Sequence, residues 1–269
     1  MQARSTFNLK ENSDMSGRFE NKVALITGGG SGIGAATAVL LAEEGATVVV
    51  TGRRRDRLDR LADGTPGDRI VPQQLDVTDA SAVTEVVNGV VERFGQLDVL
   101  VNSAGIGPSG TIEQTSEEDW DAMIATVLTG AFYAAKAALP HLKSTRGTIV
   151  NVGSVSGLGG DWGAAGYNAA KGGLTNLTRA LALDHASAGI RVNAVAPSFT
   201  KTDMTADMED DYDLMARFLD RLPLGRAAEP REIAAAIAFL ASGDASYVNG
   251  VILPVDGGLG ASNGQPRLG

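Results

Sequence analysis

The sequence predicts a single α/β domain built on a doubly wound parallel sheet of about seven strands, with helices on both faces. Short apolar runs alternate with helix-like segments from Asn21 onward, and the connections between them are short. Most of the apolar runs are rich in β-branched residues and apolar on both faces, as strands covered on both sides should be. Glycine supplies 34 of the 269 residues, which favours tight turns. This alternation of strands and helices predicts one domain over residues 19–269.

The expected elements follow one another along the chain. Strands are predicted at residues 22–27, 46–52, 70–76, 97–103, 147–153, 190–196 and 248–255. Helices are predicted at residues 33–44, 55–62, 79–94, 117–142, 165–187 and 230–241. The acidic segment 203–222 predicts one or two short helices, which form either a lid over a site or a solvated surface excursion. Residues 1–18 lack a signal-peptide core, and we expect a disordered N-terminal extension there.

Composition excludes several classes of protein. The chain has no cysteine and 2 histidines, which excludes disulfide scaffolds, thiolate zinc sites and His-rich metal sites, so no metal is expected. The 23 basic and 32 acidic residues give a net charge of −9, which disfavours nucleic-acid binding. No apolar run approaches the roughly 20 residues needed to span a bilayer. The absence of cysteine is compatible with a reducing compartment, and we expect a cytoplasmic protein.

A glycine-rich turn, residues 27–34 (TGGGSGIG), joins the first predicted strand to the first helix. Glycines permit positive φ and let the backbone lie against a pyrophosphate, while the helix N-terminus offers free N–H groups. A purely structural tight turn has a similar sequence, but the position between strand and helix favours a dinucleotide site. The residues expected to bind the cofactor here are Gly28, Ser31, Gly32, Ile33 and Gly34.

The second predicted strand ends at Arg53, without the carboxylate that binds the ribose 2′-hydroxyl of NAD. Residues 53–60 hold five arginines and two aspartates, and arginine is the residue that accommodates a 2′-phosphate. Arginines at a helix start oppose the helix dipole, which is easier to explain if an anion lies between them. We therefore expect NADP(H) to be favoured, with NAD(H) as the alternative.

Two further strand ends fall on the same edge of the sheet. Asp76 and Val77 close the third strand, where a carboxylate can accept from an adenine amino group. Asn102, Ala104 and Gly105 close the fourth, where small residues let the chain pass beneath a cofactor. Each would be an ordinary turn alone, but sheets of this kind bind ligands at the carboxyl ends of their strands.

Tyr167 and Lys171 are spaced i, i+4 on a predicted helix, so both side chains lie on one face. A phenol has an ordinary pKa near 10 and donates poorly at neutral pH unless a cation stabilises the phenolate. Lys171 supplies that cation, and Ser154, at the end of the fifth strand, can hold a substrate oxygen. The three residues predict a general acid for carbonyl reduction or a base for alcohol oxidation. The alternative is that Tyr167 and Lys171 only pack together.

The combination of motifs resembles the short-chain dehydrogenase/reductase family. The resemblance runs from about Lys22 to Gly258 and rests on the glycine loop, NSAG (102–105), Ser154, YNAAK (167–171) and APSFTKTDM (196–204). It implies a Rossmann-type sheet, hydride transfer to or from a nicotinamide, and a homotetramer.

The resemblance also implies roles for individual residues. Tyr167 matches the catalytic acid/base, and Ser154 matches the partner of the substrate oxygen. Lys171 matches the residue that lowers the pKa of the tyrosine and binds the nicotinamide ribose. The residues that match those holding the carboxamide are Pro197, Thr200 and Thr202.

The chain departs from the family pattern at three positions. Ser103 replaces the second Asn of Asn-Asn-Ala-Gly, and Ser198 replaces the Gly that usually follows Pro197. Val127 stands where many members carry an Asn, in a context such as Asn-Leu-Thr-Gly. Valine cannot hydrogen-bond a water, so a proton path from solvent to Lys171 is either missing or carried by other groups.

A closer resemblance is to one group within the family, the meso-2,3-butanediol dehydrogenases or acetoin reductases. It rests on residues 154–173, 178–185, 201–205, 224–230 and 254–266. It implies a small ketone, hydroxyketone, secondary alcohol or vicinal diol as substrate, with Ser156, Trp162 and Met204 as candidate substrate residues. These enzymes commonly use NAD, whereas the arginines after the second predicted strand of this chain favour NADP. Two alternatives stay open: a 3-oxoacyl or other carbonyl reductase, and a non-catalytic dinucleotide sensor.

Overall fold

The computed structural model describes residues 17–209, 211–263 and 265. The expected disordered extension of residues 1–18 therefore lies outside the described residues, except for its last two. Arg18, one of these two, forms an ion pair with Glu44 at 2.6 Å.

Seven parallel strands form one sheet in the order β3-β2-β1-β4-β5-β6-β7. The strands are β1 (Val23–Thr27), β2 (Thr47–Gly52), β3 (Ile70–Gln74), β4 (Val99–Asn102), β5 (Thr148–Val152), β6 (Arg191–Pro197) and β7 (Ile252–Val255). All seven predicted strands are confirmed, and the order is that of a doubly wound, Rossmann-type sheet. β7 is shorter than predicted because two asparagine side chains form hydrogen bonds between β6 and the residues that precede β7. Asn249 Oδ1 accepts from Val192 N at 2.9 Å, and Val251 N donates to Asn193 Oδ1 at 3.1 Å.

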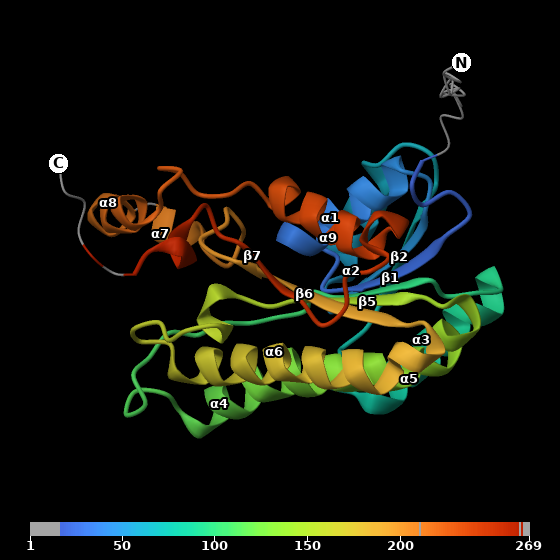
Figure 1. Ribbon diagram of the computed structural model, residues 1–269, viewed down its shortest axis with the longest axis horizontal. Helices are drawn as coiled ribbons and strands as arrows, with labels where there is room; N and C mark the ends of the chain where they lie inside the picture. Colours follow the sequence, from blue (N-terminus) through green and yellow to red (C-terminus); the bar gives the residue numbers. More distant parts are fainter. Residues whose placement is uncertain (1–16, 210, 264, 266–269) are drawn as a thin grey trace, which may run out of the picture.

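Helices cover both faces of the sheet (Figure 1). They are α1 (Gly32–Glu43), α2 (Arg55–Asp63), α3 (Ala80–Phe94), α4 (Glu117–Met123), α5 (Gly130–Thr145), α6 (Ala165–His185), α7 (Ala206–Glu209), α8 (Tyr212–Arg221) and α9 (Pro230–Ala241). The predicted helix 117–142 is one continuous run in which a π-helical segment, Ile124–Thr129, separates α4 from α5. The acidic segment 203–222 forms two short helices, as expected, and these lie at one end of the molecule (Figure 1).

The core consists of two apolar layers, one on each face of the sheet. Successive residues of a strand point to opposite faces, and β1 shows this alternation. Ala24 and Ile26 belong to the layer shared with α1 and α9, whereas Val23 and Leu25 belong to the layer shared with α3 and α5. Burial on both faces is why the strands have continuous apolar sequences.

The helical run Glu117–Thr145 is the one segment of the described chain that is long and apolar enough to cross a membrane by length and composition. It has 29 residues and a mean hydropathy of 1.5, and 39% of its most apolar window is buried. The expectation that no apolar run approaches the length of a membrane span is corrected for this one segment. Within the fold, α5 packs against α3 and β4 of the α/β domain.

Candidate active site

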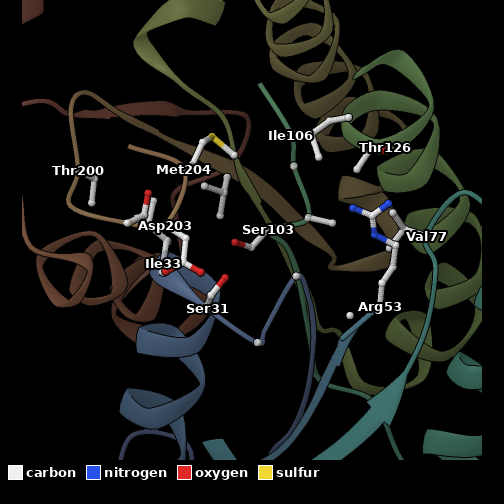
Figure 2. A pocket seen from close by; sticks show the side chains of 18 of the residues that line it. Ser31, Ile33, Arg53, Val77, Ser103, Ile106, Thr126, Thr200, Asp203 and Met204 are labelled. Atoms are coloured by element: carbon white, nitrogen blue, oxygen red, sulfur yellow. The ribbon is translucent and has the colours of Figure 1, made fainter. Parts of the chain in front are cut away.

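A pocket of about 450 Å³ opens at the carboxyl ends of the strands, around the point between β1 and β4 where the strand order reverses. Ligands of doubly wound sheets bind in this crevice. Figure 2 shows residues from both halves of the sheet around it. The predicted residues that line the pocket are Gly28, Ser31, Gly32, Ile33, Arg53, Asp76, Val77, Ala104, Gly105, Ser154, Tyr167, Lys171, Pro197, Thr200, Thr202 and Met204.

Four predicted residues do not line this pocket. Gly34 packs against the backbone of the glycine loop, and the Asn102 side chain lies inside the sheet, where Nδ2 donates to Asn151 Oδ1 at 2.9 Å. Ser156 lies buried behind Ser154. Trp162 is fully exposed, so its indole forms no wall of the pocket described here.

The glycine loop lies directly against the end of β4. Gly28 has φ +66°, and a Cβ on it would lie 2.7 Å from the backbone of Ala104. Ser31 precedes α1 without capping it through its side chain, which leaves N-terminal N–H groups of the helix for an anion. The bare backbone and the free helix end fit a dinucleotide pyrophosphate. When bound, such a cofactor would supply or accept the hydride.

Gly34→Ala is expected to disrupt this loop. A Cβ at position 34 would lie 2.3 Å from Gly28 O and 3.2 Å from Gly29 Cα, and backbone atoms cannot rotate away. We expect dinucleotide affinity to fall and the free energy of unfolding to drop by about 1–3 kcal/mol. Denaturant unfolding and cofactor titration measure both effects.

The matched control is Gly89→Ala, at an exposed position in α3 with nothing within 4 Å of the new Cβ. Because alanine favours the helix, this variant should gain about 0.5–1 kcal/mol of stability. Equal behaviour of the two variants would contradict the close-packing role of Gly34.

Three arginines, Arg53, Arg54 and Arg57, line the pocket after β2, and only Arg53 was predicted to bind the cofactor. Asp203 forms an ion pair with Arg57 and lies 4.0 Å from Arg54. Arg53 has no carboxylate partner within the described part of the chain, and Figure 2 shows it on the side of the pocket that carries Val77. Its guanidinium is therefore available to an anion.

The start of the acidic segment reaches the pocket. Asp203, Met204 and Thr205 line it, whereas α8 packs Met215 and Phe218 around Phe199. The lid function of the whole segment stays a prediction. The pairing of Asp203 with Arg57 joins positions 146 residues apart, so no local sequence signal could have shown it.

β5 and α6 bring the predicted proton donor together. Ser154 follows β5, and its hydroxyl hydrogen-bonds the phenol of Tyr167. Lys171 is buried one turn along α6, where its Nζ donates to Val152 O at 2.7 Å and lies 5.6 Å from the centroid of the Tyr167 ring. The phenol, hydroxyl and ammonium thus face the same pocket.

Burial controls the protonation of this group. It raises the pKa of Tyr167 above its ordinary value, an effect that the nearby Asp161 carboxylate adds to and the Ser154 hydrogen bond opposes. Burial also lowers the pKa of Lys171 to about 8. The i, i+4 spacing of Tyr167 and Lys171 predicted that the ammonium lowers the pKa of the phenol, whereas in the structure desolvation raises it. At neutral pH the phenol keeps its proton, as a general acid requires.

The position of Val127 is closed to water. Its side chain is 1% exposed and packs with Ala131, Ala170 and Leu174. It belongs to the π-helical segment, whose Thr126 side chain lines the pocket instead. Thr126 was not predicted because the π-helical segment that carries it has no clear local sequence signal.

Comparison with known proteins identifies the family. A family model described as enoyl-(acyl carrier protein) reductase matches residues 28–260. The meso-2,3-butanediol dehydrogenase of Serratia marcescens is 49% identical over 251 residues, which are 93% of this chain and 99% of that protein. The chain belongs to the short-chain dehydrogenase/reductase family.

Two further members of the short-chain dehydrogenase/reductase family show the range of relatives. A 3-oxoacyl-(acyl-carrier-protein) reductase of Thermotoga maritima is 45% identical over 90% of this chain and 99% of its own. The crystal structure of levodione reductase superimposes with a TM-score of 0.86 at 37% identity, covering 91% of this chain and 99% of that one. Membership confirms the predicted fold and enzyme class: an oxidoreductase acting on CH–OH groups with a nicotinamide nucleotide.

Proposed function

We propose that this enzyme interconverts a small ketone or hydroxyketone with its secondary alcohol or vicinal diol, using Tyr167 as the general acid/base. The observation that carries the proposal is the meeting of Ser154, Tyr167 and Lys171 with the glycine loop around one pocket. A sensor needs the loop but has no use for a protonated phenol beside a buried ammonium. The 49% identity to a meso-2,3-butanediol dehydrogenase supports the small substrate.

A second candidate is reduction of a 3-oxoacyl thioester, which the Thermotoga maritima relative favours. Purified enzyme should be assayed at the nicotinamide absorbance band with acetoin, diacetyl, a panel of ketones and a 3-oxoacyl thioester. Fast turnover of acetoin or diacetyl supports the first proposal, and turnover of the thioester alone supports the second. Cofactor binding without turnover of any compound would support the non-catalytic sensor.

We propose NADP(H) as the preferred cofactor. β2 ends without a carboxylate, and Arg53 lines the pocket without a carboxylate partner among the described residues. Arg53→Ala is expected to weaken NADPH binding about tenfold to a hundredfold and leave NADH binding unchanged, because a charge-assisted contact is worth roughly 1.5–3 kcal/mol. Titration of the enzyme with each cofactor measures this selectivity.

Arg55→Ala is the matched control for this substitution. Arg55 starts α2, pairs with Asp59 at 2.8 Å and does not line the pocket, so its loss should alter neither affinity. Equal weakening of NADH and NADPH by the Arg53 substitution would contradict the assignment.

We also propose a homotetramer in the cytoplasm. Large apolar side chains on α4, α5 and α6 are partly or mostly exposed in the single chain, among them Trp120, Phe132 and Leu183. Burial between copies would remove this surface from water. Light scattering gives the mass of the assembly, and cell fractionation gives its location.

A further inference from the structure

A chain of hydrogen-bonded side chains leads from the buried phenol to the surface. Tyr167 hydrogen-bonds Ser154, Ser154 Oγ donates to Ser156 Oγ at 3.0 Å, and Ser156 Oγ donates to the Asp161 carboxylate. Ser154 and Ser156 are 7% and 5% exposed, whereas Asp161 lies at the surface. The chain therefore connects the proton donor to bulk water through two hydroxyls and one carboxylate.

The donors in this chain have a defined direction. An ionised carboxylate only accepts hydrogen bonds, so Ser156 must donate to Asp161. The oxygen of Ser156 then accepts the proton of Ser154, whose Oγ also accepts from the Ser156 backbone N–H at 3.1 Å. Each hydroxyl thus has one proton to give and a lone pair to receive another, as proton transfer along a chain requires.

The helix that carries the phenol also holds the carboxylate in place. Asn168, the residue after Tyr167, donates from Nδ2 to Asp161 O at 2.9 Å. Asn168 Oδ1 also accepts from Asp161 N at 3.3 Å. These two bonds tie the loop of Asp161 to the first turn of α6, so both ends of the chain are fixed to the same element.

The other polar neighbour of the phenol offers no comparable route. Lys171 is 5% exposed, and Val152 O is the one hydrogen-bond partner of its Nζ within the described structure. Val127 and Lys171 both lie beside Gly105, each within about 4 Å of the position that a Cβ on Gly105 would take. The ammonium and an apolar side chain therefore both lie near Gly105, and the valine offers no hydrogen-bond donor or acceptor there.

We propose that Ser154, Ser156 and Asp161 form the relay that returns a proton to Tyr167 after each reduction; this inference rests on the proposed function. As the carbonyl carbon receives a hydride, the carbonyl oxygen takes the phenol proton and a phenolate remains. Once Asp161 has taken a proton from water, the two hydroxyls rotate from the donor direction of the resting chain, so that Asp161 donates to Ser156, Ser156 to Ser154 and Ser154 to the phenolate. One proton enters from water for each one delivered to the alcohol. The overall transfer is downhill at neutral pH because burial raises the pKa of the Tyr167 phenol above its ordinary value.

Asp161→Asn tests this relay, because the amide keeps the size of the side chain and cannot carry a proton. In this variant the first turnover, followed by rapid mixing of cofactor-loaded enzyme with a ketone, should keep its wild-type rate, since Tyr167 begins protonated. Steady-state kcat should fall about tenfold to a hundredfold, which does not exceed the loss expected from removing a general acid. The value of kcat/KM should stay at that of the wild type. In Ser156→Ala, too, the first turnover should keep its wild-type rate and the later turnovers should be slower.

Two controls separate the relay from a structural or purely electrostatic role. Asp161→Glu restores the carboxylate and should recover kcat, and Asp68→Asn removes an exposed carboxylate in a distant loop and should leave kcat unchanged. Loss of the Asp161 charge should also lower the pKa of Tyr167, followed by phenolate absorbance. A charge effect alone would therefore make the phenol a stronger acid and would not slow reduction.

Two results would overturn the relay: wild-type kcat in Asp161→Asn, or equal slowing of its first and later turnovers. A wild-type enzyme that reduces no carbonyl compound would instead overturn the proposed function, and the relay with it. Because wild-type turnover is measured first, the two failures are distinguishable.

Discussion

Tyr167→Phe is expected to lower kcat by about 10²–10⁴, the usual contribution of a general acid. The phenylalanine ring fills the space of the tyrosine on α6 and removes only the hydroxyl that hydrogen-bonds Ser154. The substrate oxygen then develops negative charge without the proton that the phenol supplies. Steady-state assays at the nicotinamide absorbance band measure the loss in both directions.

Dinucleotide binding should survive this substitution, because the glycine loop and Arg53 lie on other elements. A cofactor titration of the Tyr167→Phe variant is therefore the control for folding and for an intact pocket. Turnover close to that of the wild type would remove Tyr167 from the mechanism and the relay through Ser154 with it.

Lys171→Met is expected to remove a pH dependence from the stability of the protein. The pKa of Lys171 is about 8 in the folded chain against an ordinary 10.5, so the unfolded chain binds the extra proton between these values. The wild type therefore carries a penalty below pH 8 that disappears as the pH rises toward 10.5. The difference between a pKa of about 8 in the folded chain and the ordinary 10.5 corresponds to about 3 kcal/mol.

Denaturant unfolding at a series of pH values measures this effect as the stability of the wild type minus that of the variant. The difference should rise by about 3 kcal/mol from neutral to strongly alkaline pH. Tyrosines and lysines that do not contact Lys171 titrate in both proteins and cancel in the subtraction. A flat difference would show that the Lys171 ammonium is not destabilised by burial.

Most of the fold could be predicted from the sequence because local pattern and global packing agree. Strands such as β1 and β5 are buried along their whole length, and their continuous apolar sequences reflect that. The predicted elements differ from the observed ones where contacts between distant segments or a local change of helix type decide the structure. Asn193 and Asn249 replace strand pairing before β7, and the π-helical segment Ile124–Thr129 interrupts a helix with no break in its apolar pattern.

The candidate site could be predicted where neighbours in sequence are neighbours in space. Tyr167 and Lys171 share a helix face, and the glycines form one turn, so spacing alone placed them. Contacts between distant segments could not be predicted this way, and the pairing of Asp203 with Arg57 is an example. Burial was also invisible, which is why the sign of the effect on the phenol pKa came only from the structure.

The order of the strands bears on how such an enzyme can evolve. β1 and β4 lie between β2, which precedes the arginines, and β5, which precedes Ser154. Three strand spacings of about 4.8 Å separate these two strands by roughly 14 Å. Substitutions that far apart with no shared partner usually add independently. A lineage can therefore change its coenzyme preference through substitutions at the end of β2 without changing the catalytic residues that follow β5.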